Sequence, residues 1–373
     1  MKVVGKEVAF IHATETNARN GEGDFIRLKD GTIMLAYSSF FGGGKDHDKS
    51  VIVALFSYDE GETFTNSRVL FPLEEGQTQN MCVNFLRLNN GDIAVFYGGK
   101  TPTGTELLMR VSRDEGETFS PSKRVIKKDG YYVLENARII RLKSGRILLP
   151  LNKHDIKENG GIGVGKIAFY YSDDDGQTWI DTNNLIEHPD GEIWQGLQET
   201  GLTQFDDGTI FAYSRTSCMT QYECFSKDDG ITFTTPRASI IFSSPLAPMT
   251  IKRLHDKYSV AIYNPIPSYA SRKLIQPCHE SERTPLMLTV VDGDGSNFFE
   301  TCYHRNFLLE DDLQNAYCYY SVFVGKDYFL VSYYHSDGDP KRVLRSLKVK
   351  KVAFSEIENA TYAFKVETDK AYV

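Results

Sequence analysis

Hydrophobic and polar residues alternate along most of the chain with the period of two that is typical of β-strands. The clearest unit is an apolar strand, a tight turn that often contains Asp-Gly or a similar pair, and a second alternating strand that ends in aromatic residues. Such turn pairs suit the positive φ angles of two-residue hairpins. The pattern therefore predicts six β-hairpins, at residues 25–37, 85–97, 139–151, 202–214, 251–263 and 322–334.

A second motif, Ser-x-Asp-x-Gly-x-Thr-(Phe/Trp), begins at Ser57, Ser112, Ser172 and Ser226, and residues 291–298 hold a decayed copy in which the aspartate is displaced. The Asp side chain can accept hydrogen bonds from backbone amides of the turn, and Gly takes a backbone conformation that other residues avoid. The final aromatic ring packs between strands. We expect this motif to fasten the outer hairpin of each repeat and to serve as scaffold.

The four motifs are spaced by 55, 60 and 54 residues, at or just above the repeat lengths of β-propeller blades. We therefore predict an all-β fold, a six-bladed β-propeller of four-stranded antiparallel blades, with residues 1–373 as a single domain. No motif follows the sixth hairpin. The last blade is accordingly expected to be completed by an N-terminal strand around Val3 to Ile11.

Composition supports a globular β protein, because 41% of the residues are hydrophobic and the chain contains 21 Tyr and 23 Phe. The net charge of −8 argues against nonspecific binding to nucleic acid or to an anionic membrane. The chain has no run of about 18 apolar residues, and its first residues lack the apolar core of a secretory signal. We expect a cytoplasmic protein that has no membrane partner.

The six cysteines show no spacing typical of a metal site or of a disulfide framework. We expect free thiols, no metal and no cofactor. The cysteines are Cys82, Cys218, Cys224, Cys278, Cys302 and Cys318.

Candidate ligand-binding residues lie just before the turn of each inner hairpin, because the inner strands of a propeller surround its axis. Charged side chains on such enclosed strands are costly unless they are paired or functional. Drawn from several blades toward one axis, they favour a site there. The candidates are Arg19, Glu22, Asp24, Glu135, Asn136, Arg138, Gln198, Glu199, Tyr317, Tyr319 and Tyr320.

The repeated motif resembles the Asp-box of the sialidase (neuraminidase) superfamily, and the resemblance spans essentially the whole chain. It implies an exo-acting, retaining glycoside hydrolase that releases terminal sialic acid or a related acidic sugar from small glycosides. Members of that superfamily bind the substrate carboxylate with three arginines. They use a tyrosine nucleophile activated by a glutamate, and an aspartate as acid/base.

The segment ETGLTQFDDG, residues 199–208, resembles the one that holds the glutamate of the superfamily, which implies this role for Glu199. Tyr319, in YYSVFVGKD, resembles the nucleophile. Tyr317 and Tyr320 remain alternatives, because a shift of one residue in register exchanges the two faces of a strand and regular alternation places Tyr317 and Tyr319 on one face.

The loop FGGGKDHDKS lies where the superfamily has its acid/base aspartate. Asp46 matches best by its distance to Ser57, and Asp48 is the alternative. In this role Asp46 needs a raised pKa, which burial under a closed glycine-rich loop would supply.

Arg215 in YSR and Arg283 in ERTPL resemble the second and third arginines of the triad. The Arg-Ile-Pro motif that commonly holds the first arginine is missing. Arg19, in NARNGEGD, occupies a similar place, and Arg27 is the lesser candidate. With Glu135, Arg138 and Tyr317, these arginines form the expected substrate-binding set.

Together the residues imply a mechanism. Three guanidinium groups would hold the carboxylate of the sugar, and a neutral tyrosine would avoid the repulsion that a carboxylate nucleophile meets. Glu199 would take the proton of Tyr319, while Asp46 would protonate the leaving oxygen and then activate water.

Two other interpretations stay open. The same fold could act on a different sugar, such as another keto acid, a uronic acid or a deoxy sugar. The missing Arg-Ile-Pro motif and the additional polar residues Arg138, Tyr222 and Glu223 motivate that possibility. Propellers with Asp-boxes also serve as non-catalytic modules that bind carbohydrate or protein, and there the motif says nothing about catalysis.

Overall fold

The structure is a computed structural model that describes residues 1–101, 104–128, 130–156, 162–191, 193–266, 283–300, 304–312, 314–339 and 341–358. Strands dominate the described residues, which confirms the all-β fold class. The strands are β1 (Lys6–Ile11), β2 (Arg19–Arg27), β3 (Ile33–Phe41), β4 (Lys49–Ser57), β5 (Thr65–Phe71), β6 (Gln79–Arg87), β7 (Ile93–Thr101), β8 (Gly104–Ser112), β9 (Lys123–Arg124), β10 (Tyr131–Val133), β11 (Ile140–Arg141), β12 (Ile147–Ile156), β13 (Ile162–Ser172), β14 (Ile180–Ile186), β15 (Gln198–Gln204), β16 (Ile210–Arg215), β17 (Thr220–Ser226), β18 (Arg237–Ser243), β19 (Thr250–Leu254), β20 (Tyr258–Tyr263), β21 (Leu286–Asp292), β22 (Arg305–Glu310), β23 (Tyr317–Val324), β24 (Tyr328–His335) and β25 (Ser346–Ala353).

All six predicted hairpins are present as antiparallel pairs. They are β2–β3, β6–β7, β11–β12, β15–β16, β19–β20 and β23–β24. Short polar turns with a glycine at positive φ, such as Gly31, Gly91 and Gly208, join most of these pairs. The period-two pattern and the turn residues therefore gave the correct local structure.

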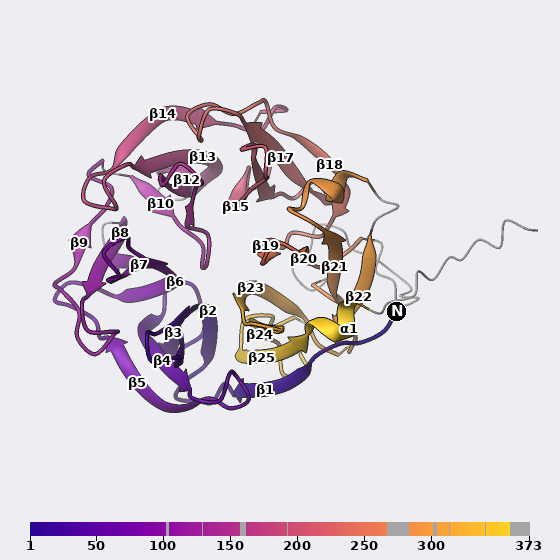
Figure 1. Ribbon diagram of the computed structural model, residues 1–373. Coiled ribbons are helices and arrows are strands. Elements are labelled where there is room, and N and C mark those ends of the chain that lie inside the picture. The colour runs from indigo at the N-terminus through magenta and orange to yellow at the C-terminus, as the bar shows by residue number, and fades with distance from the viewer. Residues whose placement is uncertain are drawn as a thin grey trace, which may run out of the picture.

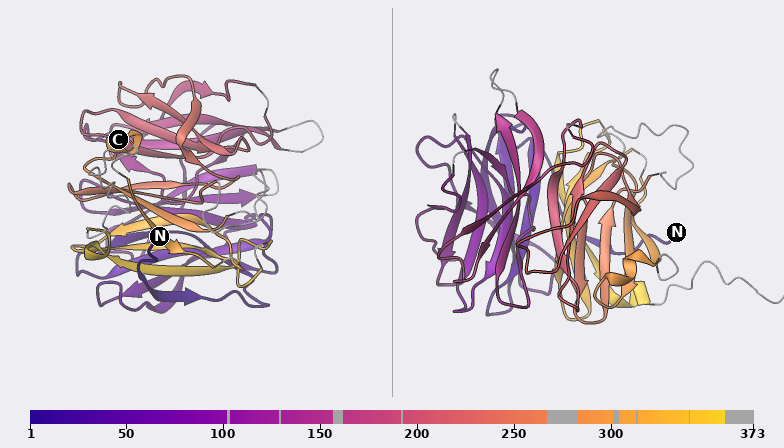
Figure 2. Two further views of the ribbon diagram at one scale, coloured as in Figure 1. Left: turned by 90° about the vertical axis from the view of Figure 1, so that its right-hand side faces the viewer. Right: turned by 90° about the horizontal axis from the view of Figure 1, so that it is seen from above.

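Three of the sheets have four strands, in the orders β15-β16-β17-β18, β19-β20-β21-β22 and β1-β25-β24-β23. Strands β2 to β14 form one sheet of 13 strands. Within it, successive sets of antiparallel strands are joined by single parallel residue pairs, which are Ser50 with Gln79 and Thr105 with Tyr131. Figure 1 shows the strand sets arranged around a centre, toward which β2, β6, β15, β19 and β23 face. In the side views of Figure 2 the axes of the long strands are roughly aligned, and the strands pass through the thickness of the molecule.

The N-terminal strand joins the last sheet, as expected from the sequence. β1 pairs antiparallel with β25, so the first and last strands of the chain lie side by side. Val4 also donates a backbone hydrogen bond to Leu308 of β22. These bonds hold the N-terminus against two neighbouring sheets.

Each of the four Asp-boxes makes the same set of hydrogen bonds. In the first box the Asp59 carboxylate accepts from the Thr63 amide at 2.9 Å, the Thr63 hydroxyl at 2.6 Å and the Ser57 hydroxyl at 2.8 Å. The Thr63 hydroxyl contributes most to lowering the pKa of Asp59 to about 2. Asp114, Asp174 and Asp228 repeat these contacts.

The boxes also join neighbouring strand sets, which the sequence did not reveal. A Cβ atom on Gly61 would lie 2.8 Å from Leu330 of β24, and one on Gly230 would lie 2.6 Å from Leu148 of β12. The box glycine is thus required both by its positive φ and by the close approach of the adjacent sheet. In the decayed fifth copy Phe298 is fully buried in the core between two sheets.

The described part of the chain contains one α-helix, α1 (Phe354–Glu358), and no helix there is long and apolar enough to span a membrane.

Candidate active site

Four inner strands carry a bulge with the same backbone conformation. The residues at the bulges are Glu22, Cys82, Glu199 and Tyr319, with φ angles of 54, 60, 51 and 59°. In each strand the pairing register shifts around this residue. Positive φ is uncommon outside glycine and strained for a bulky residue, and such strain is often found at functional sites. Here all four side chains line one cavity.

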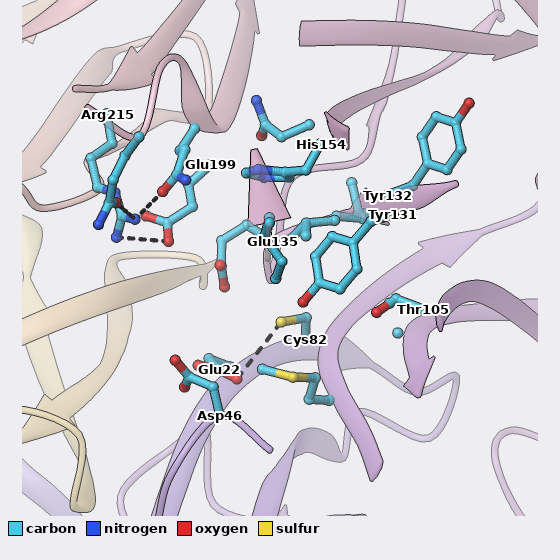
Figure 3. Close-up of a pocket in the computed structure, with 18 of the residues that line it drawn as sticks. Glu22, Asp46, Cys82, Thr105, Tyr131, Tyr132, Glu135, His154, Glu199 and Arg215 are labelled. Atoms are coloured by element: carbon cyan, nitrogen blue, oxygen red, sulfur yellow. Dashed lines mark hydrogen bonds and ion pairs between the residues drawn. The ribbon is translucent and has the colours of Figure 1, made fainter. Parts of the chain in front are cut away.

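That cavity has a volume of about 670 Å³. Figure 3 shows side chains from several strand sets pointing into it. Its polar centre holds most of the predicted site residues, which come from distant parts of the sequence. They are Arg19, Glu22, Asp46, Glu135, Gln198, Glu199, Arg215, Arg283 and Tyr319.

Tyr319, Glu199 and Arg215 form a compact group. The Tyr319 hydroxyl donates to Glu199 Oε1 at 2.7 Å, and Arg215 Nη1 lies 2.8 Å from the same oxygen. Arg215 Nη1 also lies 3.3 Å from the Tyr319 hydroxyl. Burial, followed by the charge of Glu199, raises the pKa of Tyr319 well above its ordinary value. The resting tyrosine is therefore a neutral phenol whose proton already points at a carboxylate.

Arg215 is fixed by two glutamines, one at the start of β15 and one in the connection before it. It donates to the Gln195 side chain at 3.0 Å and to the side chain of Gln198. The second carboxylate oxygen of Glu199 is buried and has no hydrogen-bond partner among the described residues. Because the first oxygen receives bonds from both Tyr319 and Arg215, the carboxylate is oriented toward the tyrosine.

Arg19 lies on β2 and is fully buried between two carboxylates. Its guanidinium contacts Glu22, lies 2.5 Å from Asp46 and donates to the Tyr334 hydroxyl at 2.8 Å. The Asp46 side chain is 65% exposed, on the glycine-rich loop that follows β3. The structure thus brings the expected first arginine and the expected acid/base into direct contact.

The expected raised pKa of Asp46 is wrong for this arrangement. Partial desolvation of the Asp46 carboxylate by the surrounding chain would raise its pKa, but the charges of Arg19, Lys100 and His47 and the hydrogen bond from Arg19 outweigh this effect, so that the pKa of Asp46 lies below its ordinary value. The contact with Arg19 is the physical reason. Asp48, the alternative to Asp46, accepts instead from the Lys45 amide at 2.7 Å and does not line the cavity.

Arg283, the expected third arginine, is fully buried and lines the same cavity. Its Nε and Nη2 donate to the Leu246 carbonyl at 3.1 and 2.8 Å, and its guanidinium lies 5.6 Å from the centre of the Tyr319 ring. The Leu246 carbonyl and the Tyr319 ring thus hold the positive charge of Arg283 beside Tyr319.

Two residues of the expected substrate-binding set do not reach the cavity. Arg138 donates to the Met249 carbonyl at 2.8 Å and to Thr250 Oγ1 at 3.1 Å, and its contacts are structural. The Tyr317 side chain is fully buried in the core. Tyr317 and Tyr319 were expected on one face of a regular strand, but the bulge between Cys318 and Ser321 turns Tyr319 into the cavity while Tyr317 stays in the core.

Other candidates also have structural partners. The Tyr320 hydroxyl donates to the Asn264 side chain at 2.7 Å, and Arg27 pairs with Glu60 at 2.7 Å in an Asp-box, outside this cavity. The partly buried Asp24 carboxylate accepts from the Phe85 amide and from Ser321, which ties β2 to β6 and β23.

Glu135 is 4% exposed and lines the cavity. Its Oε1 accepts from the Asn136 amide at 2.8 Å. Burial, followed by the charges of Glu199 and Glu22, raises its pKa well above the ordinary value. The residue is thus a buried carboxyl group between two others (Figure 3).

Several lining residues were not expected from the sequence. One signal would have found Cys82, because Glu22, Cys82 and Glu199 each stand nine residues before the glycine of their hairpin turn. The others lie on β7, β10 and β12 or in the connection before β15, where no repeat marks them. They are Lys100, Tyr131, Tyr132, His154, Trp194 and Gln195.

The residues that the structure describes contain no group of three or more His, Cys, Asp or Glu side chains placed to hold a metal ion. Cys82, Cys218, Cys224 and Cys318 are free thiols. Cys278 and Cys302 lie outside the described residues.

Repeated β-hairpins and Asp-boxes thus surround an inner cavity that holds the Tyr319–Glu199 pair. Residues 37–331 match the family of BNR repeat-like domains, so the chain belongs to that family. Its resemblance to the sialidase superfamily is thereby confirmed at the level of the fold. A search of curated protein sequences finds no match.

Solved structures with a similar fold include three that cover nearly the whole chain. A Dyadobacter fermentans protein of unknown function has a TM-score of 0.70 at 18% identity, covering 94% of this chain and 98% of its own. The leech intramolecular trans-sialidase complexed with 2,7-anhydro-Neu5Ac has a TM-score of 0.70 at 13% identity, with coverages of 96% and 71%. The intramolecular trans-sialidase of Ruminococcus gnavus in complex with oseltamivir carboxylate has a TM-score of 0.69 at 12% identity, with coverages of 94% and 97%.

Proposed function

We propose that this protein is an exo-acting, retaining glycoside hydrolase of the sialidase type. It would release terminal sialic acid or a related acidic sugar from small glycosides, with Tyr319 as the nucleophile. The observation that carries the proposal is the 2.7 Å hydrogen bond from Tyr319 to Glu199 in a cavity that also holds Arg19, Arg215 and Arg283.

We also propose that the fold is a six-bladed β-propeller. We count β2 to β5, β6 to β9 and β10 to β14 as three strand sets within the 13-stranded sheet, because single residue pairs join them. With the three four-stranded sheets they make six blades of one propeller domain that spans residues 1–373. The Asp-box contacts between neighbouring sets support this count.

In the first step Glu199 takes the proton of Tyr319 as the phenolic oxygen attacks the anomeric carbon. The raised pKa of Tyr319 means that this base is needed. Arg215 lies next to both groups and stabilises the negative charge as it moves from Glu199 toward the sugar ring. A neutral nucleophile also suits a substrate that carries its own carboxylate.

Asp46 protonates the leaving oxygen and later activates the water that releases the sugar. At rest it is paired with Arg19. A substrate carboxylate that takes its place on Arg19 removes the cause of the lowered pKa, so that Asp46 becomes a better acid catalyst when substrate is bound. The exposed position of Asp46 on a glycine-rich loop supports such an exchange.

A second candidate is hydrolysis of a different sugar by the same residues. Arg19, one of the arginines expected to hold the sugar carboxylate, is already paired with Glu22 and Asp46. This pairing favours a less acidic sugar than sialic acid. The strained backbone at Glu199 and Tyr319 favours a hydrolase, for either kind of sugar, over a non-catalytic binding propeller.

The first test is release of 4-methylumbelliferone from its sialic acid glycoside at mildly acidic to neutral pH, followed by the same assay with uronic acid and deoxy-sugar glycosides. Tyr319→Phe is expected to lose at least about 1,000-fold in kcat while it still binds the sugar. Tyr320→Phe, which removes a buried hydroxyl outside the cavity, is the matched control and keeps its turnover. An active Tyr319→Phe enzyme would refute the assignment of the nucleophile.

A further inference from the structure

Of the two carboxyl groups of the polar centre to which the proposed reaction gives no step, Glu22 contacts Arg19 and the other is Glu135. It is 96% buried, it lines the cavity, and its Oε1 is held by the Asn136 amide at 2.8 Å. Its Oε2 has no hydrogen-bond partner among the described residues, and this oxygen is not among the unpartnered polar atoms that are closed off from solvent. An accessible polar atom on a buried side chain has a ligand or water as its natural partner.

The groups that face Glu135 are mostly acidic. Glu199 lies on one side, and Glu22 with Cys82 lies on the other (Figure 3). The charge of Arg138 lowers the pKa of Glu135 by less than these neighbours raise it, and the Arg138 guanidinium is engaged by Met249 and Thr250.

Such surroundings favour the neutral form of the carboxyl group. A third negative charge between Glu199 and Glu22 would be opposed by both neighbours and by burial. A neutral carboxylic acid offers one O–H donor and acceptor lone pairs at the same place. A sugar hydroxyl has the same pair of capabilities, whereas an ammonium group would require the ionised form.

We propose that Glu135 is a specificity-determining residue of this cavity, whose free Oε2 hydrogen-bonds a ring hydroxyl of the bound sugar as a neutral carboxylic acid. The inference rests on the proposed function for the identity of the ligand as a sugar. It predicts that the protein rejects analogues that lack this hydroxyl, because Glu135 would then be left buried without a partner.

The test compares Glu135→Gln, which keeps a neutral donor and acceptor of the same shape, with Glu135→Leu, which keeps only the volume. With the fully hydroxylated glycoside, Glu135→Gln is expected to stay within about threefold of wild type in kcat/KM, and Glu135→Leu to lose about 10- to 100-fold. With the set of monodeoxy glycosides, the loss in Glu135→Leu is expected to disappear for the one substrate that lacks the contacted hydroxyl.

Two results would overturn the proposal. If Glu135→Gln loses as much as Glu135→Leu, the carboxyl group acts as an anion or transfers a proton. If Glu135→Leu loses the same factor with every deoxy substrate, the residue has only a structural role.

Two readouts keep this test separate from the proposed hydrolysis. The first is the infrared carbonyl band of a protonated carboxylic acid, which the wild-type protein is expected to show at neutral pH and Glu135→Gln to lack; an unchanged spectrum refutes the neutral form.

The second is binding of free sialic acid and its monodeoxy derivatives to Tyr319→Phe, measured by the fluorescence of Trp194, which lines the cavity. If no glycoside is hydrolysed but this binding depends on one hydroxyl and on Glu135, the hydrolase assignment fails and the subsite stands.

Discussion

The outer Asp-boxes and the inner-strand bulges are both repeated around the molecule, but they are repeated differently. In the boxes the residues themselves recur, and Asp59, Asp114, Asp174 and Asp228 make the same bonds in each copy. At the bulges the backbone recurs, with φ between 51 and 60°. The side chains there differ, and they are Glu22, Cys82, Glu199 and Tyr319.

This difference separates scaffold from site. A position that must make the same turn in every repeat keeps one residue, because one set of hydrogen bonds closes that turn. A position that projects into a shared cavity needs the same backbone direction but different chemistry in each repeat. The four bulges point four different side chains into one cavity, where the Tyr319 hydroxyl lies 2.7 Å from Glu199 Oε1.

The largest expected effect is at a bulge. Glu199→Gln removes the base that faces the Tyr319 proton, and kcat is expected to fall by about 100- to 10,000-fold. Steady-state kinetics with a 4-methylumbelliferyl glycoside that the wild type cleaves measures this loss. Glu223→Gln is the control, because Glu223 is a buried carboxylate paired with Arg237 outside the cavity. Equal losses in both variants would mean that the bulge has no special role.

An intermediate effect is expected in the scaffold, on stability alone. Asp59→Ala removes the hydrogen bonds that close the first box, and the melting temperature is expected to fall by about 2 °C while kcat stays unchanged. Thermal unfolding followed by circular dichroism measures the change. A loss of turnover without a change in melting temperature would contradict the division between scaffold and site.

The box aspartates also define a pH range. The pKa of Asp59 is lowered from an ordinary value of 3.8 to about 2, so its stabilising contribution is fully present above about pH 4 and is lost as the pH falls through 2. The wild type is expected to lose melting temperature over this range more steeply than Asp59→Ala does.

The smallest expected effect concerns the acid/base. Lys100 donates to the Asp46 carbonyl at 2.6 Å, and its charge helps to lower the pKa of Asp46. Lys100→Gln removes that charge, so the pKa of Asp46 rises and the basic limb of the kcat/KM profile moves to higher pH by less than about one unit. Lys29→Gln, at a lysine paired with Glu115 outside the cavity, is expected to leave the profile unchanged. A shift to lower pH, or none, would argue against Asp46 as the acid.

The sequence predicted the local features of the fold well. Hairpin turns such as that at Gly31 and boxes such as that of Asp59 depend on residues close together in the chain. The joining of β1 to β25 followed from counting strands. The contact of each box with the neighbouring sheet was not predictable, because it joins residues as distant as Gly61 and Leu330.

The site was predicted in part. The resemblance to the sialidase superfamily singled out Asp46, Glu199, Arg215 and Arg283, and all four line one cavity. Tyr317 was misplaced, because a bulge adds a residue to one strand and so reverses which side chains share a face. The pairing of Arg19 with Asp46 and the resulting low pKa of Asp46 depend on how a loop folds back, which alternation along a strand does not encode.

The most direct test of the central claim is to trap the covalent intermediate. The wild-type protein is quenched in acid during turnover of a fluorinated glycoside that slows the second step, and its peptides are mapped by mass spectrometry. The account predicts a glycosyl adduct on the peptide that contains Tyr319, absent in Tyr319→Phe. An adduct on Glu199 or Asp46, or steady turnover with inversion at the anomeric carbon, would contradict it.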